Sequence, residues 1–170
     1  LLLDLGPLGT SGRFSPGGTT TKITTPDAPA IEVTNQSFSI EFWMRVTAIA
    51  GRRVFVGKRT TPIFAPFIIM FASGNYKLYM SSTGSSWDVA NEFQATTPDV
   101  LIDTWEHFAL TRNGAALYMH SRGVYVPITT LSTEIGLFNN TEALAIGQGP
   151  YDDGGGVVTL NGWIDEFRFR

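Results

Sequence analysis

The chain has 170 residues, a formal net charge of −3 and no cysteine. This length suffices for one domain with its own hydrophobic core, and the missing cysteines exclude a disulfide framework, thiol catalysis and cysteine-ligated metals. The mild negative charge does not favour nucleic acid, and no apolar run reaches the ~20 residues of a membrane-spanning helix. We therefore expect neither nucleic acid nor a membrane as partner.

The N-terminal segment, residues 1–30, is rich in glycine, proline and threonine. Such a density of chain breakers forbids a helix and allows only turns and short strands. We expect this segment and a core sandwich at residues 31–170 to form a single domain over 1–170. The chain opens on Leu1 without a methionine and closes on Arg170 within an alternating run, which predicts a piece of a longer polypeptide.

The clearest predicted strand is 38–46, where apolar residues alternate with Ser39, Glu41, Trp43 and Arg45. Period-two alternation of this length is typical of a strand with one buried face. Hairpin turns are predicted at Ser73-Gly74-Asn75 and at Asn113-Gly114, because Gly and Asn accept a positive φ. Further strands are predicted at 54–56, 67–72, 77–81, 107–112, 116–120, 124–128, 143–147 and 164–169.

Residues 99–112 leave two interpretations open. They contain no glycine or proline, and Leu101, Trp105, Phe108 and Ala109 have helical spacing. We expect a strand in the second half because of its hairpin context, and a short helical turn in the first half.

These segments, in this order, resemble the laminin G-like, concanavalin A-like lectin/glucanase family. The most specific are Trp105-Glu-His-Phe-Ala-Leu-Thr-Arg-Asn-Gly114 and Asn161-Gly-Trp-Ile-Asp-Glu-Phe-Arg168. The resemblance implies an all-β fold, a two-sheet antiparallel jelly-roll β-sandwich, with ligands on a concave face or at the loop rim. Many relatives bind glycans, sometimes with calcium, and one branch hydrolyses β-glucans. The Leu1-Leu2-Leu3 start also looks like that of bacteriophage virion and tail members.

The sequence lacks the carboxylate pattern of the hydrolytic relatives. Glycosidases need two carboxyl groups across the scissile bond, and those relatives carry them as Glu-x-Asp-x-x-Glu on one strand. No Glu of this chain has an Asp two residues later, and the adjacent Asp165 and Glu166 would face opposite sides of a strand. We therefore predict that the protein is not an enzyme, with β-glucan hydrolysis as the remotest alternative.

Carbohydrate binding depends on aromatic rings that stack on sugars beside planar polar groups. The outer face of strand 38–46 presents Glu41, Trp43 and Arg45, and Tyr79 and His107 join them if their strands lie in the same sheet. Trp87 and Tyr151 fall in predicted loops, where core packing explains them less well. In the alternative interpretation the tryptophans pack inside the sandwich, namely Trp43, Trp105, Trp163 and also Trp87.

Two polar clusters complete the candidate residues. Asp152 and Asp153, in a glycine-rich loop, offer carboxylates to calcium, although a solvated turn is the alternative. A basic cluster would contact an acidic glycan or a neighbouring subunit, or else form a solvated hairpin; it comprises Arg52, Arg53, Lys58 and Arg59.

The pattern as a whole favours a non-catalytic module that recognises a glycan or a cell surface. We expect it outside cells or in a phage virion, within a larger oligomeric assembly. The competing hypothesis is a structural capsid or tail decoration protein whose loops contact only virion subunits. Fold alone does not decide between them.

Overall fold

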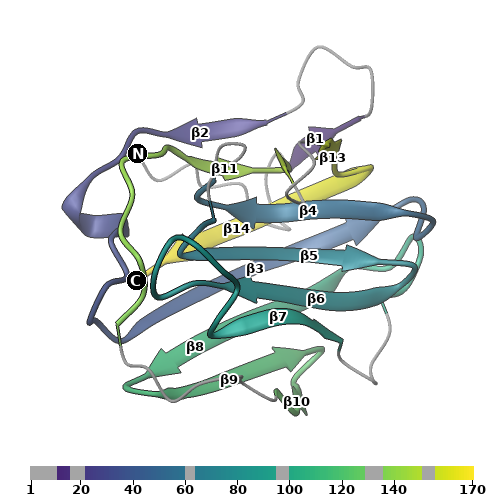
Figure 1. Ribbon diagram of the computed structural model, residues 1–170. Helices are drawn as coiled ribbons and strands as arrows, with labels where there is room; N and C mark the ends of the chain where they lie inside the picture. The colour runs from purple at the N-terminus through teal and green to yellow at the C-terminus, as the bar shows by residue number, and fades with distance from the viewer. Residues whose placement is uncertain (1–10, 16–21, 60–63, 95–99, 129–135, 151–155) are drawn as a thin grey trace.

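The computed structural model describes residues 11–15, 22–59, 64–94, 100–128, 136–150 and 156–170, and for 92–94 only the backbone. Two six-stranded antiparallel sheets face each other in these residues (Figure 1). Sheet A has the order β1-β14-β3-β8-β9-β10, and sheet B has the order β2-β11-β4-β5-β6-β7. The predicted all-β, two-sheet jelly-roll sandwich is confirmed.

The strands of sheet A are β1 (Gly12–Phe14), β3 (Phe38–Val46), β8 (Glu106–Asn113), β9 (Ala116–Ser121), β10 (Val124–Val126) and β14 (Gly162–Phe169). Those of sheet B are β2 (Ile23–Thr25), β4 (Arg52–Gly57), β5 (Phe67–Ala72), β6 (Asn75–Met80), β7 (Ala90–Gln94) and β11 (Leu144–Ile146). A separate hairpin joins β12 (Gln148–Pro150) to β13 (Val157–Thr159), and a 3₁₀ turn, η1, spans Pro29–Ile31.

The main core lies between the two sheets and is rich in phenylalanine. The apolar residues of β3 are buried while its polar residues stay partly exposed, as the alternation predicts. Phe42 from β3 packs against Phe108 of β8 and Phe55 of β4, with ring centroids 5.1 and 5.6 Å apart. Rings from both sheets therefore pack against one another between the sheets. Because these residues face inward, the residues that alternate with them along each strand face outward.

A second apolar cluster covers the outer face of sheet B. Ile68, Met70 and Tyr79 point away from the main core and pack with Val54 and Trp87. Loops and the β12–β13 hairpin close over these side chains, since Phe64 and Val158 pack against the cluster. The outer face of sheet A, by contrast, keeps side chains partly exposed along β3, β8, β9 and β10. Among the described residues, the outer face of sheet A is therefore the broader accessible surface built on regular strands.

Most predicted strands are found, with ends that differ by one or two residues. Strands 38–46 and 67–72 match the observed bounds, and the hairpin turn at Ser73-Gly74 has positive φ at both residues. The helical turn predicted in the first half of 99–112 is wrong for residues 100–105. There the chain forms no helix: Ile102 makes a parallel bridge to Val46, and Asp103 lies in a turn with φ 55°.

Candidate functional site

The outer face of sheet A gathers aromatic and charged side chains from six strands. Cross-strand pairing places Trp43 opposite His107, Glu41 opposite Ala109, and Ala109 opposite His120. Side chains directly opposite on one face of a sheet are in contact range. The outward residues are Arg13 of β1, Trp163 and Arg168 of β14, Glu41, Trp43 and Arg45 of β3, His107 of β8, Tyr118 and His120 of β9, and Tyr125 of β10.

Trp43 and His107 form the centre of this face. Their ring centroids lie 5.3 Å apart at an interplanar angle of 60°. Nε2 of His107 is 3.7 Å from Oε2 of Glu41, so the imidazole lies between an indole and a carboxylate. An aromatic ring beside fixed polar groups is the combination that sugar recognition requires.

Glu41 is the acidic residue around which basic side chains collect. Arg168 approaches its Oε1 to 3.6 Å and Arg170 to 4.0 Å. Both pairs are exposed to solvent, so each stabilises the fold little. Their effect is to hold the carboxylate oriented beside His107, where it can accept hydrogen bonds from a ligand.

One row of this face consists of two arginines flanking a tryptophan. Arg13, Trp163 and Arg45 lie directly opposite one another on β1, β14 and β3. The guanidinium carbons are 5.5 and 5.2 Å from the indole centroid, within cation–π range. Arg45 also reaches Oδ1 of Asp103 at 3.4 Å.

Trp43 and Trp163 are partly exposed on the outer face of sheet A, so the alternative that they pack inside the sandwich is wrong. Trp105 is also partly exposed.

The structure brings Glu41, Trp43, Arg45 and His107 together, as their positions in the sequence predict. Tyr79 does not join them, because β6 belongs to sheet B and the Tyr79 side chain is 5% exposed in its outer cluster. Alternation shows which face of its strand a side chain lies on, but it does not show to which sheet that strand belongs.

Trp87 lies in a loop, as predicted, but its ring is not an exposed stacking platform. It is 9% exposed and packs edge-on against Phe64, with Tyr79 at 5.3 Å and the Arg59 guanidinium 5.2 Å from its centroid. The ring therefore closes the outer cluster of sheet B, which makes it a packing residue.

The basic cluster is not a shared exposed patch. Lys58 is fully buried, and its Nζ contacts Asp27 Oδ1 at 2.5 Å and donates to the carbonyl of Asn140 at 2.8 Å. Arg59 is also buried, whereas Arg52 and Arg53 are partly exposed. Lys58 therefore links the segments that contain Asp27 and Asn140. A buried ammonium group is stable only when charged or polar partners of this kind surround it.

The calcium hypothesis and one aromatic candidate fall on residues that are not described. Tyr151, Asp152 and Asp153 lie outside the described residues. Within the described ranges no three residues of the His, Cys, Asp and Glu types are grouped to hold a metal ion. Within the same ranges no helix is long and apolar enough to cross a membrane.

Three outward residues of the β9–β10 hairpin were not among the predicted candidates. Tyr118 and Tyr125 are 44% and 48% exposed, and His120 packs against Tyr125 with centroids 5.7 Å apart. Tyr118 and His120 share the same alternation within the predicted strand 116–120. That signal was available in the sequence, whereas the contact of His120 with Tyr125 depends on the hairpin register.

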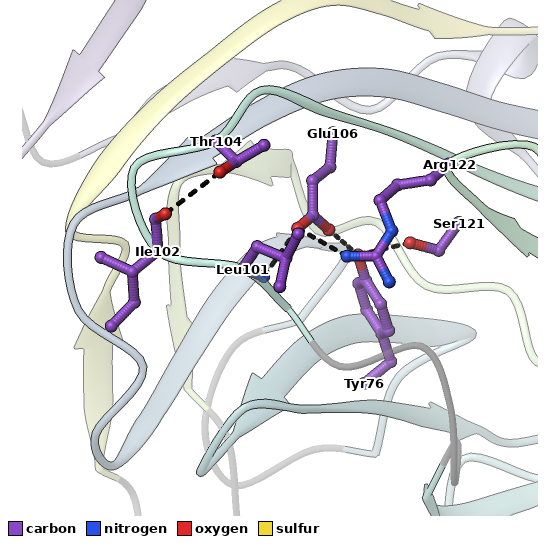
Figure 2. A network of polar contacts seen from close by, with 7 residues as sticks. All are labelled: Tyr76, Leu101, Ile102, Thr104, Glu106, Ser121 and Arg122. Carbon is purple, nitrogen blue, oxygen red and sulfur yellow. Dashed lines mark hydrogen bonds and ion pairs between the residues drawn. The ribbon is translucent and has the colours of Figure 1, made fainter.

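A buried polar network supports this hairpin from inside (Figure 2). Glu106 is 1% exposed; its Oε1 accepts from the Leu101 amide at 2.6 Å and from Arg122 Nη1 at 3.2 Å, and its Oε2 accepts from Tyr76 Oη at 3.1 Å. Tyr76 Oη also lies 3.0 Å from Ser121 Oγ. Burial raises the pKa of Tyr76 above its ordinary range, and the nearby carboxylate of Glu106 acts in the same direction. The network thus joins β6 of one sheet to β8 and β9 of the other.

Two packed six-stranded antiparallel sheets define a jelly-roll β-sandwich. The chain belongs to the concanavalin A-like lectin/glucanases superfamily, whose laminin G model matches residues 17–169. No curated protein matches the sequence.

Solved structures share the fold at low sequence identity. Domains LG4-5 of the mouse laminin alpha1 chain superpose with a TM-score of 0.67 at 12% identity, covering 94% of this chain and 40% of that one. A candidate carbohydrate-binding protein of Bacteroides ovatus gives 0.67 at 15%, covering 94% and 42%. Botulinum neurotoxin type C, whose cell entry depends on two ganglioside molecules, gives 0.61 at 14%, covering 87% and 36%. This chain spans about two fifths of the length of these chains.

Proposed function

We propose that this chain is a non-catalytic recognition module that binds a glycan through the outer face of sheet A. The observation that carries the proposal is the partly exposed Trp43, packed against His107 and next to the carboxylate of Glu41. The indole offers an apolar surface to a sugar ring, while the carboxylate and imidazole offer acceptor and donor groups to its hydroxyls. Loops and a hairpin cover the outer face of sheet B, so sheet A offers the broader regular surface.

The comparisons support binding in preference to catalysis. Two of the similar structures are described in terms of carbohydrate or ganglioside recognition, and at 14–15% identity they share only the fold with this chain. Fold alone does not assign function, so the side chains on the outer face of sheet A are what favour a glycan ligand. The proposed location is the cell exterior or a phage virion, where the module would belong to a larger assembly.

The proposal is tested by screening the 170-residue protein on a glycan array and then titrating a glycan that binds. Trp43→Ala should weaken binding of that glycan roughly 5- to 30-fold, as expected for the loss of one stacked ring and its buried area. Val157→Ala is the control, because this exposed residue lies on the β12–β13 hairpin, outside sheet A.

Two results would contradict the proposal. Unchanged affinity of Trp43→Ala would place the glycan site elsewhere. Absence of glycan binding by the wild-type protein would favour the architectural alternative, in which the domain contacts only neighbouring virion subunits.

A further inference from the structure

The end of sheet A farthest from β14 carries three ring side chains in one outward group. Tyr118 and His120 alternate along β9, and Tyr125 lies directly opposite His120 on β10. We call Tyr118, His120 and Tyr125 the hairpin shelf. The two tyrosines are among the exposed large hydrophobic side chains in the described part of the chain.

The strand beside the shelf leaves these rings uncovered. On β8, Ala109 lies opposite His120 and Thr111 lies opposite Tyr118. A methyl group and a small hydroxyl side chain cannot cover an aromatic ring. The ring faces therefore remain accessible from the direction of Trp43.

The shelf is held in a fixed position by the buried network below it. Arg122, in the β9–β10 turn, donates its amide to the carbonyl of His107 at 2.8 Å and its guanidinium to Glu106. Ser121, one residue away, contacts Tyr76 of the opposite sheet (Figure 2). Binding to a rigid shelf costs little ordering entropy, which favours ligand stacking.

The chemistry of the shelf selects a small, uncharged, ring-shaped ligand. Strands β9 and β10 contain no Asp, Glu, Lys or Arg. The exposed area of the two tyrosines is roughly 200 Å², given 150–250 Å² for a whole aromatic side chain, and a specific protein interface needs about 800 Å² on each partner. Phenol and imidazole groups beside an apolar ring face fit a neutral sugar.

We propose that the hairpin shelf is a second stacking subsite for a neutral hexose unit of the same glycan that contacts Trp43. This inference rests on the proposed function of the outer face of sheet A. Trp43 on β3 and Tyr125 on β10 are separated by three strand spacings, roughly 14 Å across the sheet, and are offset by two residues along the strands. The ligand is therefore an oligosaccharide that crosses β3, β8, β9 and β10, and a single sugar fills only part of the site.

The test uses the intact 170-residue protein and neutral hexose oligomers of one to six units, in the gluco-, manno- and galacto- series. Calorimetry and ¹⁵N-labelled NMR titration would measure affinity against oligomer length for the wild type, Tyr118→Ala and Tyr125→Ala. Tyr125→Phe keeps the ring, and Val124→Ala is the control on the same hairpin. These side chains are exposed, so the amide spectra should show a folded protein in each case.

We expect wild-type affinity to rise with length until the oligomer spans both subsites. Each Tyr→Ala change should weaken hexamer binding about 2- to 10-fold and leave monosaccharide binding unchanged. Tyr125→Phe keeps the stacking ring and loses only the hydroxyl, so its hexamer affinity should lie between those of Tyr125→Ala and the wild type, and Val124→Ala should bind like the wild type.

The proposal of a second subsite is contradicted if affinity rises with oligomer length in the Tyr→Ala variants as it does in the wild type. If Trp43→Ala still weakens every oligomer in that case, the proposed function stands without the shelf. If the wild type binds none of the oligomers while the array identifies another glycan, the neutral-hexose assignment fails and the proposed function stands. If no glycan binds at all, both proposals fail.

Discussion

Arg122 donates from Nη1 to Oε1 of Glu106 across 3.2 Å, which ties the β9–β10 turn to the first residue of β8. Arg122 occupies the left-handed region at φ 52°, followed by Gly123 at 74°. Positive φ at two consecutive residues is typical of the tight type I′ hairpin turn. A non-glycine residue there costs roughly 1 kcal/mol, which the charge-assisted hydrogen bond to a buried carboxylate offsets.

The first prediction concerns this ion pair. Arg122→Ala should lower the free energy of unfolding by about 2–3 kcal/mol, because it leaves the Glu106 carboxylate buried without its cation. Arg168→Ala is the matched control, since its contact with Glu41 is exposed and should be worth about 0–1 kcal/mol. Urea denaturation of both variants measures the difference. Equal losses would show that the buried pair has no special role.

The second prediction concerns the Tyr76 hydroxyl and alkaline pH. Because burial raises the pKa of Tyr76, the folded protein keeps the phenol proton at pH values where the unfolded chain, with a pKa of about 10, loses it. Stability from this group is present below pH 10 and falls above it, by at most about 1.4 kcal/mol per pH unit. Tyr76→Phe should remove this contribution and also cost roughly 1–3 kcal/mol at neutral pH, because Oε2 of Glu106 and Oγ of Ser121 lose their hydrogen bonds to the Tyr76 hydroxyl.

Denaturation of wild type and Tyr76→Phe at a series of pH values from 7 to 11 tests this point. The difference between the two free energies of unfolding should shrink above pH 10. A difference that stays constant would contradict the raised pKa.

The third prediction concerns Asp88, which orders the loop that carries Trp87. Burial acts to raise the pKa of Asp88, but hydrogen bonds from Ser82 and Ser81 outweigh it, and the net pKa is lowered. The side-chain and backbone donors of Ser82 and the hydroxyl of Ser81 all reach the carboxylate. A lowered pKa contributes stability above the unfolded value near 4, and this stability is lost as the pH falls below it.

Asp88→Asn should therefore be less stable than the wild type at pH 7, and the difference in stability between the two proteins should become smaller between pH 4 and pH 2. Thermal unfolding of both proteins from pH 7 to pH 2 measures this difference. Since Trp87 directly precedes Asp88 in this loop, its fluorescence reports loosening of the loop. A gap that widens in acid would contradict the lowered pKa.

The local sequence pattern was sufficient to predict the fold and part of the candidate site. Strand 38–46 was predicted with its bounds because five apolar residues alternate without interruption, and the same alternation placed Glu41, Trp43 and Arg45 on one face. His107 joined them because β8 pairs with β3. In contrast, β7 has no such alternation, and its strand conformation depends on pairing with the preceding strand, β6.

The features that the sequence did not predict depend on contacts between distant segments. Burial of Trp87 requires Phe64 and Tyr79 to meet it over sheet B, and alternation in β6 could not assign Tyr79 to that sheet. Burial of Lys58 requires Asp27 and Asn140 from two other segments. An aromatic or a cluster of basic residues in a predicted loop is therefore weak evidence for a binding surface.

The last prediction compares two glycines that share a left-handed backbone. Gly147 has φ 83°, and a Cβ added there would lie 2.0 Å from Cδ1 of Phe14 in the main core. Gly114 has φ 59° in the β8–β9 turn, with nothing within 4 Å of an added Cβ. Gly114→Ala should therefore cost only the backbone term of about 1 kcal/mol, whereas Gly147→Ala should cost at least about 2–4 kcal/mol because the Phe14 ring must also move. Chemical denaturation of the two variants separates the steric from the conformational contribution. Phe14→Leu combined with Gly147→Ala should recover part of the loss, and a double variant no better than Gly147→Ala alone would rule out the clash as its cause.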